Sequence, residues 1–465
     1  MLQSDKVQSS AAGKIKLREA YREAGLTIKE LAETANVGED TVKRLLGTKE
    51  CPNGVERWAA INIAKVLQIE PTDIVDPKDW YPQQLPPEFR SLIEEKIRHF
   101  CGRKFVFDKF DEFVNSNPNG YFTIVGDAGM GKSAIAAHYI ASVRSCPGYF
   151  NILAEGRNRA ELFLDSIRQQ LINFYKLSDA EKADLPTLLA KVSHKFPDER
   201  IIIVIDALDE VEQEAGAENI LYLPKTLPPN VYFLMTRRPY EPGRKRLFTE
   251  VLQRELNLNS SEYYDLNRAD IKDYIRFFIY EESKHKQAMK KWIDNRQISA
   301  ETFVEQVAQK SENNFMYLRY VLPEIACGFY DNLSLNQLPD GLIDYYQTHW
   351  VRMGMDTAPN ELMVVVLFIL KEVGTPIPCQ MIADIANQDE GEVESILDRW
   401  IEYLKPQQID GDTCYNFYHA SFLDFLKAKK ELNKNRKLFK DVNQSIVDYW
   451  ERQMEQEDED DAEDC

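Results

Sequence analysis

The chain has 465 residues, of which 44% are hydrophobic, and a net charge of −19. This length predicts about three domains, and the hydrophobic content is sufficient for their cores. No apolar run approaches the ~18 residues of a membrane span, no signal peptide is evident, and seven widely spaced cysteines favour reduced thiols, so we expect a soluble cytoplasmic protein without a membrane contact.

Residues 14–74 show a helical hydrophobic period, divided among several short helices. Thr27 and Glu30 have the spacing of a capping box, and Asn36 stands at a turn that suits the left-handed conformation. The string resembles the lambda-repressor-like helix-turn-helix family, with residues 38–46 as the recognition helix. We therefore expect a helix-turn-helix domain over residues 1–76.

Two kinds of partner remain open for this domain. Thr41, Lys43 and Arg44 are plausible DNA contacts, which would make DNA a partner of residues 14–75. Residues 1–75 nevertheless carry equal numbers of basic and acidic side chains, whereas DNA-binding domains usually show a basic footprint. A protein-docking module is therefore the rival interpretation.

Proline clusters between residues 76 and 87 predict a linker. A lead-in helix follows it, so the linker and this helix together occupy residues 77–100. The next string, residues 100–105, contains a Gly-Arg pair with Arg103 as its second member.

Residues 121–125 predict an apolar strand, and the chain then shows the P-loop spacing Gly126-x4-Gly131-Lys132-Ser133. Glycines let backbone N–H groups turn toward phosphate oxygens, the lysine reaches the β- and γ-phosphates, and the serine hydroxyl can ligate Mg²⁺. A helix that starts after the loop directs its N-terminal dipole at the anion. The predicted nucleotide contacts are Gly126, Asp127, Ala128, Gly129, Met130, Gly131, Lys132, Ser133 and Ala134.

A second apolar strand, residues 201–205, ends in Asp206, and Asp209 and Glu210 follow it. A fully apolar run is typical of a central strand in a parallel sheet, and ligands collect at the carboxyl ends of such strands. We expect Asp206 and Ser133 to hold Mg²⁺. Either Asp209 or Glu210 would orient the attacking water.

Residues 231–235 predict a third strand, followed by Thr-Arg-Arg-Pro at residues 236–239. An arginine at a strand end can sense the γ-phosphate of a nucleotide, because its planar fork matches phosphate oxygens. We expect Arg238 to have this role. The three strands predict an α/β nucleotide-binding domain with a parallel sheet over residues 101–250.

These strings together resemble the NACHT branch of the signal-transducing STAND ATPases. The P-loop resembles the Walker A motif of that family, residues 206–210 its Walker B motif, and residues 236–239 its sensor string. The resemblance also places Arg103 near the adenine, with ATP or ADP as the nucleotide.

Residues 417–426 resemble a winged-helix string of the same family. In that string a histidine contacts the β-phosphate of ADP and locks the resting state, and His419 has this position here. The aromatic residues around it also fit a core helix, which is the alternative interpretation.

We also predict the domains that follow the nucleotide-binding domain. Residues 251–335 predict a helical domain that covers the nucleotide, and residues 336–430 predict a winged-helix domain with a short strand. Residues 431–465 predict a C-terminal helix and then a disordered acidic tail, because a run of like charges cannot pack. No internal repeat array is present, so a separate sensor protein, a missing segment or the small terminal domains would do the sensing.

The resemblance implies a signalling switch with slow Mg²⁺-dependent ATPase activity. ADP would hold it closed and ATP would favour a homo-oligomer, with a separate sensor or effector protein as a further partner and bacterial antiphage defence as the role. The alternative is a DNA-binding transcription regulator whose oligomeric state is set by ATP.

Overall fold

The structure is a computed structural model. It describes residues 6–50, 54–69, 71–75, 85–143, 145–178, 180–212, 219–239, 247–282, 284–356, 359–409, 411–417, 420–433 and 436–463. The chain forms two compact units, Met1–Ile93 with Ala137–Pro147 and Glu94–Ala136 with Gly148–Cys465. Within the described ranges, no helix is both long enough and apolar enough to cross a membrane.

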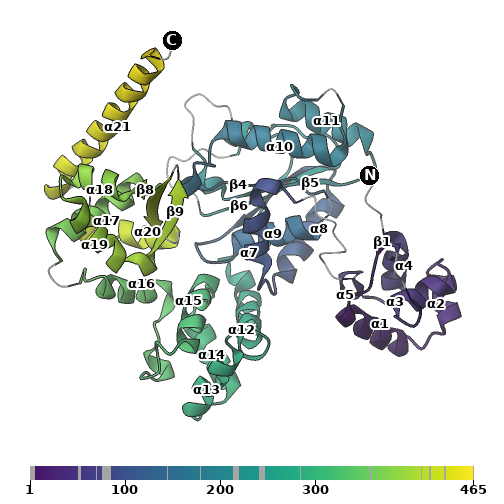
Figure 1. The fold of residues 1–465 in the computed structure, drawn as a ribbon. Helices are drawn as coiled ribbons and strands as arrows, with labels where there is room; N and C mark the ends of the chain where they lie inside the picture. Colours follow the sequence, from purple (N-terminus) through teal and green to yellow (C-terminus); the bar gives the residue numbers. More distant parts are fainter. Residues whose placement is uncertain are drawn as a thin grey trace. The chain divides into compact units, whose positions relative to one another are not determined.

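The first unit begins with five short helices (Figure 1). The predicted capping box is present, because the Glu30 N–H donates to Thr27 Oγ1 and the Thr27 N–H donates to the Glu30 carboxylate. Asn36 has a φ of 54°, as the turn requires. The helices are α1 (Ala11–Glu23), α2 (Ile28–Thr34), α3 (Glu39–Leu45), α4 (Arg57–Val66) and α5 (Pro71–Ile74), with a short β1–β2 pair (Lys6–Val7 and Val55–Glu56).

A five-stranded parallel sheet in the order β4–β5–β6–β3–β7 forms the centre of the second unit. The three predicted strands are β3, β5 and β6, and all their residues are buried, which confirms the predicted α/β class. The strands are β3 (Gly120–Val125), β4 (Gly148–Phe150), β5 (Ile201–Asp206), β6 (Val231–Arg237) and β7 (Gln253–Asn257).

Strand β7 lies beyond the boundary that we expected at residue 250, and all of it falls within residues 251–335, which we had assigned to a helical domain. It is an edge strand whose side chains are mostly exposed and polar, so it lacks the apolar run of a buried strand. Strand β4 has only three residues and was also missed. The sheet domain therefore ends later than the sequence indicates.

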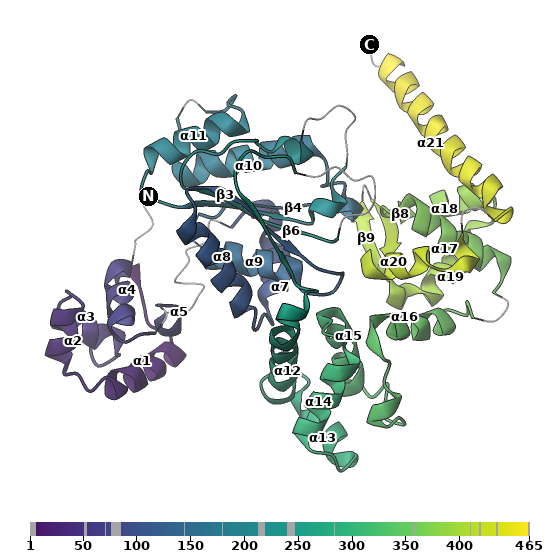
Figure 2. The same cartoon turned by 180° about the vertical axis from the view of Figure 1, so that it is seen from behind.

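Helices cover both faces of the sheet (Figures 1 and 2). On one face, Phe110 and Phe113 of α8 pack against Phe122 of β3. On the other face, Phe163 of α10 packs edge-on against Tyr149 of β4. The helices of this region are η1 (Pro87–Phe89), α7 (Arg90–Ile97), α8 (Lys104–Ser116), α9 (Lys132–Ser142), η2 (Leu153–Glu155), α10 (Ala160–Tyr175), α11 (Leu185–Lys195), η3 (Leu208–Glu210) and η4 (Ile220–Tyr222).

The rest of the second unit is mainly helical, as predicted, with a small antiparallel sheet in the order β8–β10–β9. Its strands are β8 (Ile377–Pro378), β9 (Leu404–Ile409) and β10 (Asp412–Phe417). Its helices are η5 (Ser261–Tyr263), α12 (Tyr264–Tyr280), α13 (Lys286–Asn295), α14 (Ala300–Lys310), α15 (Phe315–Ala326), η6 (Leu335–Gln337), α16 (Gly341–Arg352), α17 (Glu361–Val373), α18 (Cys379–Ala386), α19 (Glu390–Arg399), η7 (Ile401–Tyr403), α20 (Ala420–Lys427), η8 (Lys430–Leu432) and α21 (Leu438–Glu463).

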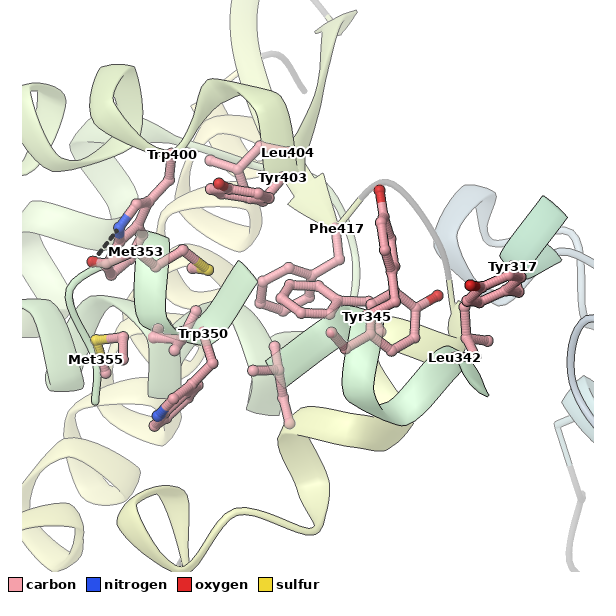
Figure 3. Close-up of a cluster of buried hydrophobic side chains, with 14 of the residues drawn as sticks. Tyr317, Leu342, Tyr345, Trp350, Met353, Met355, Trp400, Tyr403, Leu404 and Phe417 are labelled. Atoms are coloured by element: carbon pink, nitrogen blue, oxygen red, sulfur yellow. Dashed lines mark hydrogen bonds between the residues drawn. The ribbon is translucent and has the colours of Figure 1, made fainter. Parts of the chain in front are cut away.

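One continuous hydrophobic core joins these helices, from Ile271 in α12 to Val442 in α21. Figure 3 shows its central part, which includes Tyr345 of α16 and Phe417 of β10, and in which the Trp400 indole N–H donates to the Met353 carbonyl at 3.1 Å. The expected helical and winged-helix segments therefore share a core.

The acidic C-terminal run is helical in the structure, which corrects our expectation of a disordered tail. Helix α21 continues to Glu463 and includes residues 451–463. Glutamate, glutamine and methionine are strong helix formers. The helix propensity of these residues explains why the acidic run continues the helix, although its like charges disfavour packing into a core.

Candidate nucleotide-binding site

The P-loop connects the end of β3 to the first residue of α9, at the carboxyl edge of the parallel sheet. Gly129 and Gly131 have φ values of 82° and 83°, which residues with a Cβ rarely adopt. A Cβ on Gly129 would also lie 2.2 Å from Asn314 Oδ1. Backbone conformation and packing thus both require glycine at this position.

Lys132 folds back over the loop. Its Nζ donates to the carbonyl oxygens of Gly126 at 2.7 Å and Asp127 at 2.8 Å. Burial lowers the pKa of Lys132, while the carboxylates of Asp209 and Asp206 act in the opposite direction. Phosphate oxygens can replace the two carbonyl acceptors, so the ammonium group is placed to receive an anion.

Asp206 lies at the end of β5 and is almost fully buried. Its carboxylate accepts hydrogen bonds from the hydroxyls of Ser133 and Thr236. Burial raises the pKa of Asp206, and these two hydrogen bonds partly offset the effect. The two predicted Mg²⁺ ligands, Ser133 and Asp206, are therefore in contact, and their oxygen atoms suit this hard cation.

Thr236 orients the carboxylate of Asp206, and we had predicted no role for Thr236 from the sequence. Its hydroxyl donates to Asp206 Oδ1 and also accepts the Ala207 N–H at 3.0 Å. Thr236 is fully buried at the end of β6. Its contact with Asp206 depends on β6 lying beside β5, and sequence alone does not give that strand order.

The structure separates the two acids that we had left as alternatives for orienting water. Asp209 accepts the Arg238 backbone N–H at 2.9 Å and lies 3.3 Å from Arg238 Nε. Glu210 instead accepts the Leu153 N–H at 3.1 Å, and burial raises the pKa of Glu210 to about 7. A carboxylate that titrates near neutral pH suits proton transfer.

Arg238 links the sheet domain to the C-terminal helices. Its guanidinium contacts Asp209 and also forms an ion pair with Asp424 of α20. Burial lowers the pKa of Arg238, but Asp424 and Asp209 outweigh this effect and leave its pKa raised. Asp424 lies in the string that resembles the winged-helix motif, where we had assigned a function only to the histidine.

Arg103 is directed into the protein rather than toward a nucleotide. The side chain is 2% exposed, its Nη2 donates to the Met130 carbonyl at 2.6 Å, and Asn267 accepts from Nη1. The guanidinium also lies 4.8 Å from the centre of the Phe315 ring. Burial lowers the pKa of Arg103 to about 10. The predicted contact with adenine is therefore replaced by contacts with the back of the P-loop.

The two remaining predictions concern other parts of the chain. His419, the predicted phosphate contact, lies outside the described residues. Thr41, Lys43 and Arg44, the predicted DNA contacts, lie on α3. There, Lys43 Nζ pairs with Glu39 at 3.1 Å.

Residues 101–238 match the protein family described as "Nephrocystin 3, N-terminal", and this segment contains the P-loop, Asp206, Asp209, Glu210 and Arg238. The match covers less than a third of the chain. No curated protein matches the chain.

Three of the solved structures that are similar to this chain have the following identity, coverage and TM-score. A chain of Drosophila ORC bound to DNA is 11% identical, with 75% of this chain and 99% of that chain covered and a TM-score of 0.30. The Thermotoga maritima RuvB Holliday junction branch migration motor is 10% identical, with coverage of 71% and 96% and a TM-score of 0.25. A STAND protein with a tetratricopeptide repeat sensor from Pyrococcus horikoshii is 16% identical, with coverage of 76% and 45% and a TM-score of 0.28.

Proposed function

We propose that this chain is an ATP/ADP-operated signalling switch of the NACHT type, with slow Mg²⁺-dependent ATPase activity. ADP holds a closed form, and ATP favours an open form that assembles into a homo-oligomer. A nucleotide shifts such an equilibrium only through different affinities for the two forms. The matched segment 101–238 and the contacts of Arg238 support this proposal.

The main support for this switch is that Arg238 contacts Asp209 and Asp424 at the same time. Asp209 follows the predicted Mg²⁺ ligand by three residues, whereas Asp424 belongs to α20. A γ-phosphate competes with Asp424 for the same guanidinium, because both offer paired anionic oxygens. In the proposed switch, ATP therefore weakens the link between the sheet domain and α20, and ADP leaves it in place.

The site residues divide the chemistry. Lys132 and the loop N–H groups bind phosphate oxygens, and Ser133 and Asp206 hold Mg²⁺, which neutralises phosphate charge when bound. Glu210 orients the attacking water and accepts its proton, and its raised pKa suits this task. Hydrolysis returns the guanidinium of Arg238 to Asp424.

We also propose that α2 and α3 form a helix-turn-helix and that β8–β10 with α17–α20 form a winged helix. The charges of α3 favour a protein partner over DNA. Lys43 is paired with Glu39, and Lys49 Nζ pairs with Asp40 at 2.5 Å. Phosphate contacts would have to break these ion pairs. A salt-sensitive gel shift with duplex DNA would support the DNA-binding regulator instead.

The proposed role is bacterial antiphage defence in the cytoplasm, which rests on the resemblance of the site strings to the NACHT family. Its test is a plaque assay with cells that carry the wild-type chain or Lys132→Ala. Protection by the wild type and loss of protection in the variant are expected. Equal plaque counts for the wild type and Lys132→Ala would exclude the role in defence and would not bear on the proposed nucleotide switch.

The direct test of the switch is to denature freshly purified protein and identify the released nucleotide. Near-stoichiometric ADP is expected, because the closed form retains it. An empty site with rapid ATP turnover would indicate a continuously cycling ATPase. Absence of nucleotide binding under all conditions would refute the proposal.

A further inference from the structure

Every carbonyl group of the P-loop from Gly126 to Met130 accepts a hydrogen bond. Lys132 donates to the first two carbonyls, and residues outside the loop and its helix donate to the other three. The donors are Asn314 Nδ2 to Ala128 at 2.9 Å, the Phe315 and Met316 N–H groups to Gly129 at 2.9 and 3.3 Å, and Arg103 Nη2 to Met130 at 2.6 Å.

These contacts fix the direction of N–H groups on the opposite side of the loop. A trans peptide unit is planar, so the carbonyl of one residue and the N–H of the next point in opposite directions. A donor that holds the Ala128 carbonyl thus orients the Gly129 N–H, and a donor that holds the Met130 carbonyl orients the Gly131 N–H. Both glycines have positive φ and a wide choice of conformations without such restraint.

The Asn314 side chain makes hydrogen bonds with both ends of its amide group. Its Oδ1 caps α15 by accepting the N–H groups of Met316 at 2.9 Å and Tyr317 at 3.3 Å, while its Nδ2 donates to the Ala128 carbonyl. The side chain lies so close to Gly129 that a Cβ there would clash with Oδ1. Both ends of the amide are used, and the helix cap fixes its orientation.

Arg103 is held equally firmly. Its backbone N–H donates to Asp270 Oδ2 at 2.9 Å, and its guanidinium bonds Asn267, which in turn donates to the Leu258 carbonyl at 2.8 Å. The ring of Phe315, next to Asn314, stacks on the guanidinium. The two donors therefore belong to one connected group behind the loop, in which Arg103 and Asn267 are buried.

We propose that Asn314 and Arg103 are positioning residues for the phosphate cradle. By holding the carbonyls of Ala128 and Met130, they direct the N–H groups of Gly129 and Gly131 toward phosphate oxygens. This inference rests on the proposed nucleotide binding. It also connects the cradle to the C-terminal core, because α15 contributes to both.

The test uses the full chain with Asn314→Asp. Aspartate keeps an oxygen that caps the helix, but it replaces the amide donor with a second oxygen facing the Ala128 carbonyl. We expect the affinities for ATP and for inorganic tripolyphosphate, measured by calorimetry, to fall by the same factor of about ten, since the Gly129 N–H is no longer directed at the phosphates and losing one such hydrogen bond costs about one factor of ten.

The matched control is Asn360→Asp. Asn360 caps α17 by accepting the Leu362 N–H at 3.0 Å. It should leave both affinities and the unfolding temperature of the unliganded protein unchanged, whereas unliganded Asn314→Asp, which loses a hydrogen bond, should unfold at a lower temperature than the wild type. Arg103→Lys, which keeps the charge and loses the planar fork, is the second test variant and decides the question if Asn314→Asp does not fold.

The outcomes separate this inference from the proposed function. Equal losses for ATP and tripolyphosphate support it. Wild-type affinity in Asn314→Asp, or a loss confined to ATP, overturns it while leaving nucleotide binding intact, because the residue would then not act on the phosphates. Failure of the wild type to bind either probe overturns both.

Discussion

The P-loop region contains two arginines whose environments differ sharply. Arg103 is 2% exposed, and its guanidinium bonds Asn267 and the Met130 carbonyl and lies 3.8 Å from Asp270 Oδ2 in a buried group behind the loop. Arg238 is 26% exposed in its side chain and lies between the carboxylates of Asp209 and Asp424, the latter 44% exposed. Both residues are arginines near the same loop, yet one environment is closed and the other is open to solvent.

This difference in exposure separates the contacts that maintain the conformation of the P-loop from those that can respond to nucleotide. The buried contacts of Arg103 have no competitor, because water and ions do not reach them, so they maintain one geometry. A partly exposed ion pair contributes only about 0–1 kcal/mol and exchanges readily for another anion. We therefore assign the conformation of the loop to its buried back and the response to nucleotide to its carboxylate side.

The largest expected effect comes from Lys132→Ala. The variant loses the ammonium group that now bonds two loop carbonyls and would bind phosphate. Binding of ATP should fall below detection in a calorimetric titration that gives clear binding with the wild type. Normal ATP affinity in this variant would refute the assignment of the phosphate site.

The second prediction concerns Glu210→Gln, which keeps the shape of the side chain and removes its basicity. ATP binding should persist while turnover falls by about 100- to 10,000-fold, the usual contribution of a general base. In the wild type, turnover should rise with pH and level off above the pKa of Glu210, about 7, because only the ionised carboxylate accepts a proton. A flat profile between pH 5 and 8 would assign the base elsewhere.

The sequence predicted the parts of this site that are local in the chain. Strands β3, β5 and β6 are buried apolar runs, and the residues proposed to bind nucleotide lie at or directly after their ends. Edge strand β7 has no such run.

The contacts that sequence missed are those between distant segments. Asn314 reaches a loop 186 residues earlier in the chain, and Arg238 meets a carboxylate 186 residues later. Arg103 was predicted from its motif to lie near the adenine, but its partners in α12 depend on the packing of that helix behind the loop.

The third prediction tests the exposed arginine. Asp424→Asn removes one of the two carboxylates that hold Arg238, so the open form should gain population. Because both side chains are partly in solvent, we expect a shift of about two- to fivefold in the oligomeric fraction with ATP, corresponding to less than about 1 kcal/mol. Light scattering coupled to size-exclusion chromatography measures this fraction.

The control for Asp424→Asn is Asp165→Asn, which also frees an arginine. Asp165 pairs with Arg168 inside α10 and is 69% exposed. It should leave the oligomeric fraction unchanged. If both variants behave alike, the effect follows from surface charge, and Arg238 has no special link to α20.

The smallest expected effect concerns α3. Lys43 already pairs with Glu39 at 3.1 Å, and both side chains are partly exposed. Lys43→Ala should therefore change neither the affinity that the full chain shows for duplex DNA nor the salt dependence of that affinity. A DNA-binding helix would instead lose affinity for all sequences and reduce the slope of log K against log salt by about one. Measuring this slope by fluorescence anisotropy on the wild type and the variant decides whether α3 faces phosphates or a protein.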